Sequence, residues 1–91
     1  MTTKEKKLSD TGTDIREDSG KRLILFNDDI NTFDFVIETL IEVCGHDPQQ
    51  AENCTLIAHF KGKCAIKTGA LEGLKPCYET MILKRLTVEI Q

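Results

Sequence analysis

The chain has 91 residues and a formal net charge of −3, from 12 Lys and Arg against 15 Asp and Glu. Its length is that of a single domain, and its basic residues form no stripe of the kind that binds nucleic acid. No apolar run approaches the roughly 20 residues that cross a membrane, and the N-terminus lacks the apolar stretch of about 7–15 residues that marks a secretory signal. We therefore expect a cytoplasmic protein that binds neither nucleic acid nor a membrane.

The composition of the chain changes near Gly20. Residues 1–20 carry only three large apolar side chains, Met1, Leu8 and Ile15, and so little apolar surface cannot offset the entropy lost on ordering. We expect residues 1–20 to form a flexible N-terminal extension and residues 21–91 to form the folded domain. A domain of this size buries only about 60% of the surface of its unfolded chain, which leaves room for one modest core and a shallow groove.

The first expected element is a short buried strand over residues 23–26, a continuous apolar run that the polar residues 27–29 end. A helix follows, because Asn31 and Asp34 give an N-cap pattern, with Thr32 as an alternative cap. A glycine ends this helix after residue 44. Its apolar residues recur at the spacing of one helix face. They are Phe33, Val36, Ile37, Leu40, Ile41 and Cys44.

A second helix is expected to start at Asp47, which can cap it, with Pro48 in the first helical position and Gln50 placed for a capping box. Gly62 ends it. Residues 63–67 then alternate between polar and apolar, which is typical of a half-buried strand.

Residues 68–73 have the composition of a turn, and a third helix is expected from about Lys75 or Pro76 to Leu83. The strict alternation of residues 86–91 predicts a final strand. The order strand, helix, helix, strand, helix, strand predicts an α+β fold, in which helices cover one side of a small three-stranded antiparallel sheet.

The four cysteines favour neither a metal site nor a disulfide framework. Cys44, Cys54, Cys64 and Cys77 include no C-x-x-C pair, and a chain without a secretory signal is not expected to form disulfides. We expect all four to be buried, reduced thiols that pack as small apolar side chains.

The candidate functional residues are polar groups that follow the first strand, together with a histidine near the end of the second helix. Asn27, Asp28, Asp29 and His59 offer an amide oxygen, carboxylates and an imidazole nitrogen as acceptors, and converging acceptors suit the donors of an ammonium group. The alternative is structural: the polar run is a satisfied turn, and the histidine interacts with the helix dipole.

A pocket beside this cluster is expected to involve Phe33, Thr55 and Ala58, although helical spacing makes Phe33 an equally good core residue. Two Asp and one His also suit a divalent metal or acid–base chemistry. However, no fourth ligand, nucleophile motif or Gly-rich phosphate loop accompanies them. We therefore expect no enzyme activity, no metal and no cofactor.

These residues form a pattern that resembles the ClpS family, the adaptors of the bacterial N-degron pathway. The resemblance runs from about Arg22 to Ile90. It rests on four segments in order: Leu25-Phe26-Asn27-Asp28-Asp29, Asp34-Phe35-Val36-Ile37, Ala51, and His59-Phe60-Lys61-Gly62-Lys63. It implies a fold similar to the C-terminal domain of a ribosomal stalk protein. It also implies a non-enzymatic adaptor that binds proteins with a bulky apolar first residue and delivers them to a ClpA- or ClpC-type AAA+ unfoldase for degradation by ClpP.

The resemblance implies roles for particular residues. Asn27, Asp29 and His59 would hold the α-amino group, with Asp28 supporting it. The side-chain pocket would be lined by Asn31, Phe33, Thr55, Ala58 and Leu86. Glu72 and Lys75 fall near the surface that docks on the N-terminal domain of the unfoldase, and residues 1–20 match the extension that engages it. We expect the protein to act as a monomer.

The chain departs from the family pattern in the pocket. Asn31-Thr32-Phe33 replaces the usual Thr-Pro-Met, Thr55 replaces a methionine, Ala58 replaces a branched residue, and the segment 67–85 is shorter. The amine-binding residues are kept while the pocket is reshaped, which predicts an altered preference for the first side chain. The alternative is a divergent ClpS-like protein that binds the unfoldase and modulates its substrate choice without binding N-degrons.

Overall fold

The computed structural model describes residues 20–91, so the extension expected at residues 1–20 lies outside it except for Gly20. The described elements follow one another as β1 (Lys21–Phe26), α2 (Phe33–Cys44), α3 (Pro48–Lys61), β2 (Lys63–Gly69), α4 (Leu71–Leu83) and β3 (Val88–Ile90). The predicted α+β fold and its order of elements are confirmed. None of the helices between residues 20 and 91 combines the length and the apolar character that a membrane span requires.

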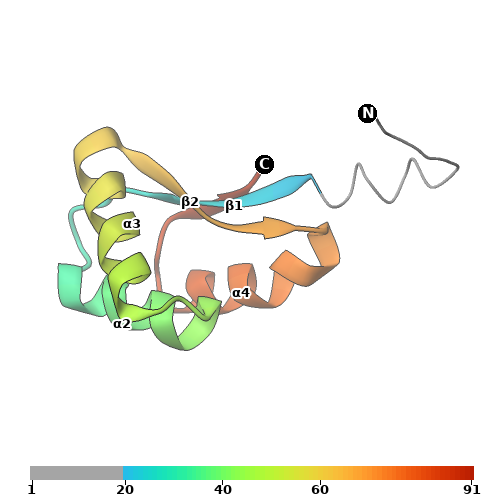
Figure 1. The fold of residues 1–91 in the computed structure, drawn as a ribbon, viewed down its shortest axis with the longest axis horizontal. Coiled ribbons are helices and arrows are strands. Elements are labelled where there is room, and N and C mark those ends of the chain that lie inside the picture. Colours follow the sequence, from blue (N-terminus) through green and yellow to red (C-terminus); the bar gives the residue numbers. More distant parts are fainter. Residues whose placement is uncertain (1–19) are drawn as a thin grey trace, which may run out of the picture.

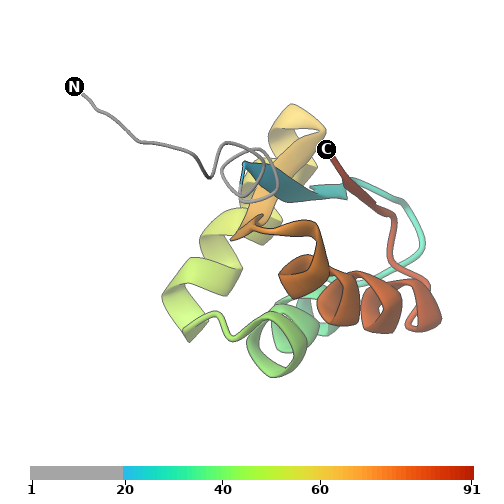
Figure 2. The same ribbon diagram turned by 90° about the vertical axis from the view of Figure 1, so that its right-hand side faces the viewer.

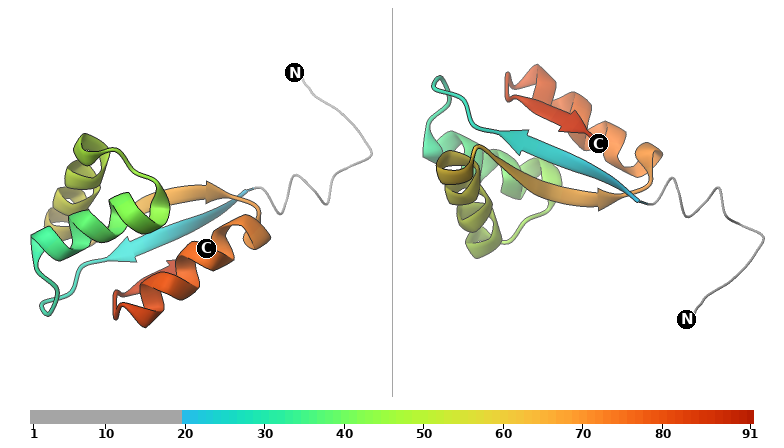
Figure 3. Two further views of the ribbon diagram at one scale, coloured as in Figure 1. Left: turned by 90° about the horizontal axis from the view of Figure 1, so that it is seen from below. Right: turned by 90° about the horizontal axis from the view of Figure 1, so that it is seen from above.

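The three strands form an antiparallel sheet in the order β2-β1-β3. The apolar strand β1, which the sequence predicted to be buried, lies in the middle (Figure 3). Its end, Phe26, pairs with Lys63 at the start of β2. The pairing shifts by one residue between Leu23 and Ile24, where Ile66 is the additional residue of β2. This pairing places the C-terminal end of β1 beside the end of α3.

The helices pack on one face of the sheet, and the core lies between the two layers (Figures 1 and 2). Leu23 and Leu25 reach into this core from β1, and the most deeply buried helical side chains include Leu40, Leu74 and Met81. Leu40 and Met81 are each fully shielded from solvent. Helices α2 and α4 also contact each other in this core.

Local signals in the sequence account for the ends of α2 and α3. Thr32 caps α2, because its Oγ1 accepts a hydrogen bond of 3.1 Å from the backbone N–H of Phe35. Asp47 caps α3 in the same way, through a bond of 2.8 Å from the N–H of Gln50. Gly62 ends α3 with φ of 95°, in the left-handed region that favours glycine. Thr32, the alternative cap, is thus the one used, and Asn31 is free for another role.

Helix α4 begins earlier than predicted. It starts at Leu71 and runs through Pro76, whereas the sequence predicted a turn up to residue 73 and a start at Lys75 or Pro76. Its N-cap residue, Ala70, makes no side-chain capping bond, so the usual start signal is missing. A proline inside a helix removes one backbone hydrogen bond and costs about 3 kcal/mol. Tertiary burial of Leu74, Cys77 and Met81 offsets that cost.

The cysteines differ from expectation at one pair. Cys44 and Cys77 form a disulfide between the end of α2 and the middle of α4, so the prediction that all four thiols are reduced is wrong for these two. Cys54 and Cys64 are free and partly buried. The pairing depends on where α2 meets α4, which spacing along the chain does not reveal.

Candidate functional site

The loop between β1 and α2 is shaped by the carboxylate of Asp28. Its Oδ1 accepts hydrogen bonds from the backbone N–H groups of Ile30 and Asn31, at 2.9 and 2.8 Å. Its Oδ2 accepts a third bond, of 3.0 Å, from the side-chain amide of Asn31. Asp residues commonly hold turns by bonding to backbone N–H groups a few residues ahead. Asp28 therefore holds the turn together, which is the structural role that the sequence offered as the alternative to ligand binding.

These bonds leave Asp28 charged and still able to accept. Partial burial by itself raises the pKa of the Asp28 carboxyl, but the hydrogen bonds from Asn31 and Ile30 together lower that pKa below its usual range. A carboxylate offers about four lone-pair positions, and the loop uses three of them, two on Oδ1 and one on Oδ2. One position on Oδ2 remains for a donor from outside the loop.

Two further hydrogen bonds fix the loop against distant parts of the chain. The backbone N–H of Asn27 donates to the carbonyl of Gly62 at 3.0 Å, which ties the end of β1 to the end of α3. The amide of Asn31 donates to the carbonyl of Arg85 at 3.0 Å, after the end of α4. The loop is thereby held beside the last turn of α3, where His59 lies.

The His59 ring stands between two phenylalanine rings. Its centroid lies 5.0 Å from that of Phe33 and 4.9 Å from that of Phe60, and both contacts are edge-to-face, with interplanar angles of 76° and 77°. Such contacts orient an imidazole without using its nitrogen atoms. None of the residues in 20–91 forms a hydrogen bond to the His59 side chain, so its acceptor nitrogen is available.

The loop, the start of α2 and the last turns of α3 enclose a cavity of about 30 Å³. Its walls combine polar groups with an apolar interior. The lining residues are Leu25, Phe26, Asn27, Asp28, Asn31, Phe33, Val36, Thr55, Ala58 and His59. Val36, Thr55 and Ala58 are buried, whereas Phe33 is 42% exposed. The Thr55 hydroxyl donates to the carbonyl of Ala51 at 2.8 Å within α3, so its donor is satisfied.

Most residues predicted from the sequence meet at this cavity. Asn27, Asp28, His59, Asn31, Phe33, Thr55 and Ala58 all line it. Two do not: Asp29 is exposed on the loop, and Leu86 is buried away from the cavity wall. Leu25, Phe26 and Val36 also line the cavity, although they were not among the predicted site residues. The sequence could have indicated them, because Leu25 and Phe26 directly precede the polar loop and Val36 follows Phe33 by one helical turn.

Two other predictions concern residues outside the cavity. Glu72 and Lys75 are exposed on the first turns of α4, where a partner can reach them. Within residues 20–91, no group of three or more His, Cys, Asp and Glu side chains is placed to hold a metal ion.

Comparison with known proteins identifies relatives of this chain. The family model described as "ATP-dependent Clp protease adaptor protein ClpS" matches residues 16–83. A protein of Nitratidesulfovibrio vulgaris, named ATP-dependent Clp protease adapter protein ClpS, is 36% identical over 64 residues, which cover 68% of this chain and 64% of that protein. A protein of the same name from Acetivibrio thermocellus is 39% identical over 54 residues, covering 59% of this chain and 54% of that protein. The matches thus span less than two thirds of each relative.

Proposed function

Because the chain belongs to the ClpS family of ATP-dependent Clp protease adaptors, we propose that it binds the free N-terminus of N-degron proteins. In this proposal the cavity takes the α-amino group and a bulky apolar first side chain, and the protein delivers its cargo to a ClpA- or ClpC-type AAA+ unfoldase. One observation carries the proposal: hydrogen-bond acceptors and an apolar interior line the same cavity.

The acceptors suit an ammonium group. Asn27 contributes an amide oxygen, Asp28 the remaining position on Oδ2, and His59 one ring nitrogen, so that three acceptors meet the three donors of an α-ammonium. Asp28 adds a full negative charge that the loop already holds in place. Asp29, which does not line the cavity, adds charge from the rim and is expected to contribute less, because exposed charges are screened by solvent.

The apolar part of the cavity suits the first side chain. Leu25, Val36 and Ala58 offer no polar group that a bound hydrocarbon would leave unpaired, and the hydroxyl donor of Thr55 is satisfied within its own helix. An internal peptide segment lacks the α-amine, so it would leave the acceptors buried and unpaired. Discrimination between a terminus and an internal segment follows from that cost.

The energies are consistent with useful binding. A hydrogen bond to a charged group contributes about 1.5–3 kcal/mol, and burial of one Leu or aromatic side chain adds about 1.5–3 kcal/mol. Two or three such bonds and one side chain, less the cost of association, give binding in the micromolar range or somewhat tighter.

Delivery requires a second surface. Glu72 and Lys75 are exposed on α4, an element that contributes nothing to the cavity lining, so cargo and unfoldase can be bound at the same time. Residues 1–20, of which only Gly20 belongs to the described part of the chain, are proposed to engage the unfoldase. Their removal is expected to abolish degradation of a model substrate while leaving the affinity for its N-terminal peptide unchanged.

One observation favours a second candidate. A cavity of about 30 Å³ is small beside the roughly 150 Å³ that accommodates benzene in an engineered protein cavity. The second candidate is a ClpS-like protein that binds the unfoldase and changes its choice of substrates without taking N-degrons. A change in the set of substrates that the unfoldase degrades when this protein is added, in the absence of any affinity for peptides with a free N-terminus, would support it.

The two candidates are separated by fluorescence-polarisation titrations. Peptides that begin with Phe, Leu, Trp or Ala are titrated with the wild-type protein, with His59→Ala and with Asp34→Asn. Asp34 is an exposed carboxylate in the first turn of α2 that does not line the cavity, so its variant shows how far a nearby substitution outside the cavity changes the attraction for the peptide's ammonium group. The proposal is supported if peptides with a bulky first residue bind the wild type and Asp34→Asn with similar affinity but bind His59→Ala at least about tenfold more weakly. That factor corresponds to the loss of one hydrogen bond to a charged group. No binding of any peptide with a free N-terminus contradicts it.

A further inference from the structure

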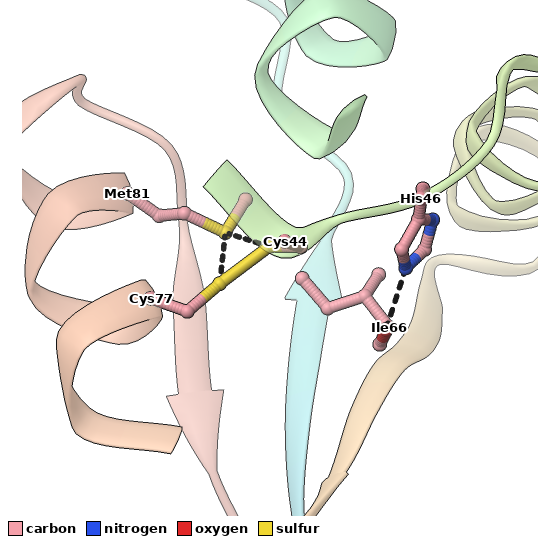
Figure 4. Close-up of a disulfide and its surroundings, with 5 residues drawn as sticks. All are labelled: Cys44, His46, Ile66, Cys77 and Met81. Carbon is pink, nitrogen blue, oxygen red and sulfur yellow. Dashed lines mark hydrogen bonds between the residues drawn. A yellow bond between two sulfur atoms is a disulfide. The ribbon is translucent and has the colours of Figure 1, made fainter. Parts of the chain in front are cut away.

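Two cysteine side chains meet where the end of α2 packs against the middle of α4. Cys44 and Cys77 are 33 positions apart in the chain, yet their Cα atoms lie 5.9 Å apart, a separation at the centre of the range found for disulfides. The two Sγ atoms are joined in the structure (Figure 4). Met81 lies beside them, with its Sδ 3.5 Å from the sulfur of Cys44 and 3.9 Å from that of Cys77.

The two cysteines differ in access. Cys77 is only 4% exposed, whereas Cys44 is partly exposed and lines an open pocket of about 360 Å³ between the α2–α3 connection and β2. His46 helps to hold this pocket together, because its Nε2 lies 2.6 Å from the carbonyl oxygen of Ile66 on β2. A pocket of this volume has the size of small-molecule sites. A small reagent therefore approaches the pair from the side of Cys44.

The remaining cysteines, Cys54 on α3 and Cys64 on β2, provide an internal comparison, because both are partly exposed like Cys44. Burial, a hydrogen bond with Cys54 and the charge of Cys54 together raise the pKa of the Cys64 thiol to about 12. The thiolate is the form that attacks a disulfide, so Cys64 is expected to stay unreactive. Exposure alone does not separate Cys44 from Cys54, but within residues 20–91 Cys44 and Cys77 are the pair whose Sγ atoms are joined, while Cys54 and Cys64 are free.

We propose that Cys44 and Cys77 form a reversible dithiol–disulfide site that exchanges with low-molecular-weight disulfides, and that the exchange enters through Cys44. The Cys44 thiolate attacks one sulfur of the small disulfide, which forms a mixed disulfide and releases one small thiolate. The Cys77 thiolate then attacks the Sγ of Cys44 and releases the second small thiolate. The two protons lost by the cysteines appear on the two small thiols, so one small disulfide is reduced for each protein disulfide formed.

The bond has a structural consequence for the two helices. It connects α2, whose first turns border the cavity, with α4, which carries the exposed Glu72 and Lys75. Because the disulfide closes a loop that contains α3 and β2, it restricts the unfolded chain. The oxidised protein is expected to unfold at a higher urea concentration than the reduced protein.

The test uses glutathione disulfide as the probe and the full-length chain. No Lys or Arg lies between Arg22 and Lys61, so a tryptic peptide carries Cys44 and Cys54 together. Cys54 and Cys64 are therefore both changed to alanine as a background. In that background the reduced protein should lose two hydrogen atoms in mass as the disulfide forms. The variant that also carries Cys77→Ala should stop at a glutathione adduct on Cys44.

The matched variant, Cys44→Ala in the same background, leaves the buried Cys77 as the single thiol. It should form its adduct at least about tenfold more slowly, because access limits exchange. Equal adduct rates at the two cysteines would overturn the proposed entry through Cys44. The same exchange is also followed by mass spectrometry in the unmodified wild-type protein, so that the test of the site does not depend on whether each variant folds. A wild-type protein that keeps both thiols free, or that pairs Cys54 with Cys64 instead, would overturn the site itself.

Discussion

Replacement of Phe33 tests how the cavity admits a bulky first residue. Phe33 is 42% exposed, whereas its neighbours in the lining, Val36, Thr55 and Ala58, are 9%, 4% and 4% exposed. It is therefore the side chain that can leave the cavity at least cost. Since the cavity volume is only about 30 Å³, a bound Phe or Trp side chain requires such a movement, and we expect Phe33 to turn outward when these residues bind.

The size of the effect follows from the contact that Phe33 gives up. Its edge-to-face contact with His59, at 5.0 Å between centroids, contributes about 0.5–1.5 kcal/mol. Phe33→Ala removes this cost before binding, so affinity for peptides that begin with Phe or Trp should rise about 2- to 12-fold. Peptides that begin with Ala need no extra space and should bind with unchanged affinity.

Phe60→Ala is the matched control for this prediction. Phe60 makes the same kind of contact with His59, at 4.9 Å and 77°, but it does not line the cavity and is 76% exposed. Fluorescence-polarisation titrations of both variants should show a size-dependent gain only for Phe33→Ala. Equal changes in the two variants, or a loss of affinity for every peptide with Phe33→Ala, would refute the view that Phe33 obstructs the cavity.

Three further predictions concern stability, each measured by urea unfolding. Asp28→Asn should lower the free energy of unfolding near pH 6 by about 1 kcal/mol, a low value because the side chain is partly exposed. The pKa of Asp28 is lowered in the folded state. The charged Asp28 side chain therefore contributes fully to the free energy of unfolding above the unfolded pKa of about 3.9, and this contribution is lost as the pH falls through the folded pKa. A difference in the free energy of unfolding between variant and wild type that grew below about pH 4 would contradict this. Pro76→Ala should stabilise the protein by about 1–2 kcal/mol, because it restores a backbone hydrogen bond within α4. The gain is limited because the unfolded chain has more conformational entropy without the proline. Destabilisation would show instead that the proline ring packs favourably. The Cys44–Cys77 disulfide, with a sequence separation of 33, should contribute about 3–4 kcal/mol relative to the reduced protein, and Cys77→Ala should remove the dependence on reductant.

The sequence predicted those features that have local causes. The 3, 1, 3, 1, 3 spacing of apolar residues and the Asp47-Pro48 start signal located α2 and α3, because caps and amphipathic faces act within a few residues. The start of α4 was missed because Ala70 gives no cap and Pro76 normally ends a helix. There, burial against the core outweighs local preference, and burial cannot be read from the segment itself.

In the candidate site, too, some features have local signals in the sequence and others depend on contacts between distant residues. Asn27, Asp28 and His59 were predicted to converge, and the bond between the N–H of Asn27 and the carbonyl of Gly62 is the contact that brings the loop to α3. The role of Asn31, which joins the loop to the carbonyl of Arg85, depends on a contact 54 positions away and has no local signal. The meeting of Cys44 and Cys77 is likewise a property of how α2 and α4 pack.

Isothermal titration of one peptide in two forms tests the central claim most directly. The peptide begins with Leu and carries either a free or an acetylated α-amino group, and all other atoms are identical. Acetylation removes two or three hydrogen bonds to a charged group, each worth about 1.5–3 kcal/mol, so affinity should fall at least about 100-fold. The free peptide should also bind more weakly as the pH rises above about 8, where the amine loses its proton. Equal affinity for the two forms would show that the cavity does not recognise a free N-terminus.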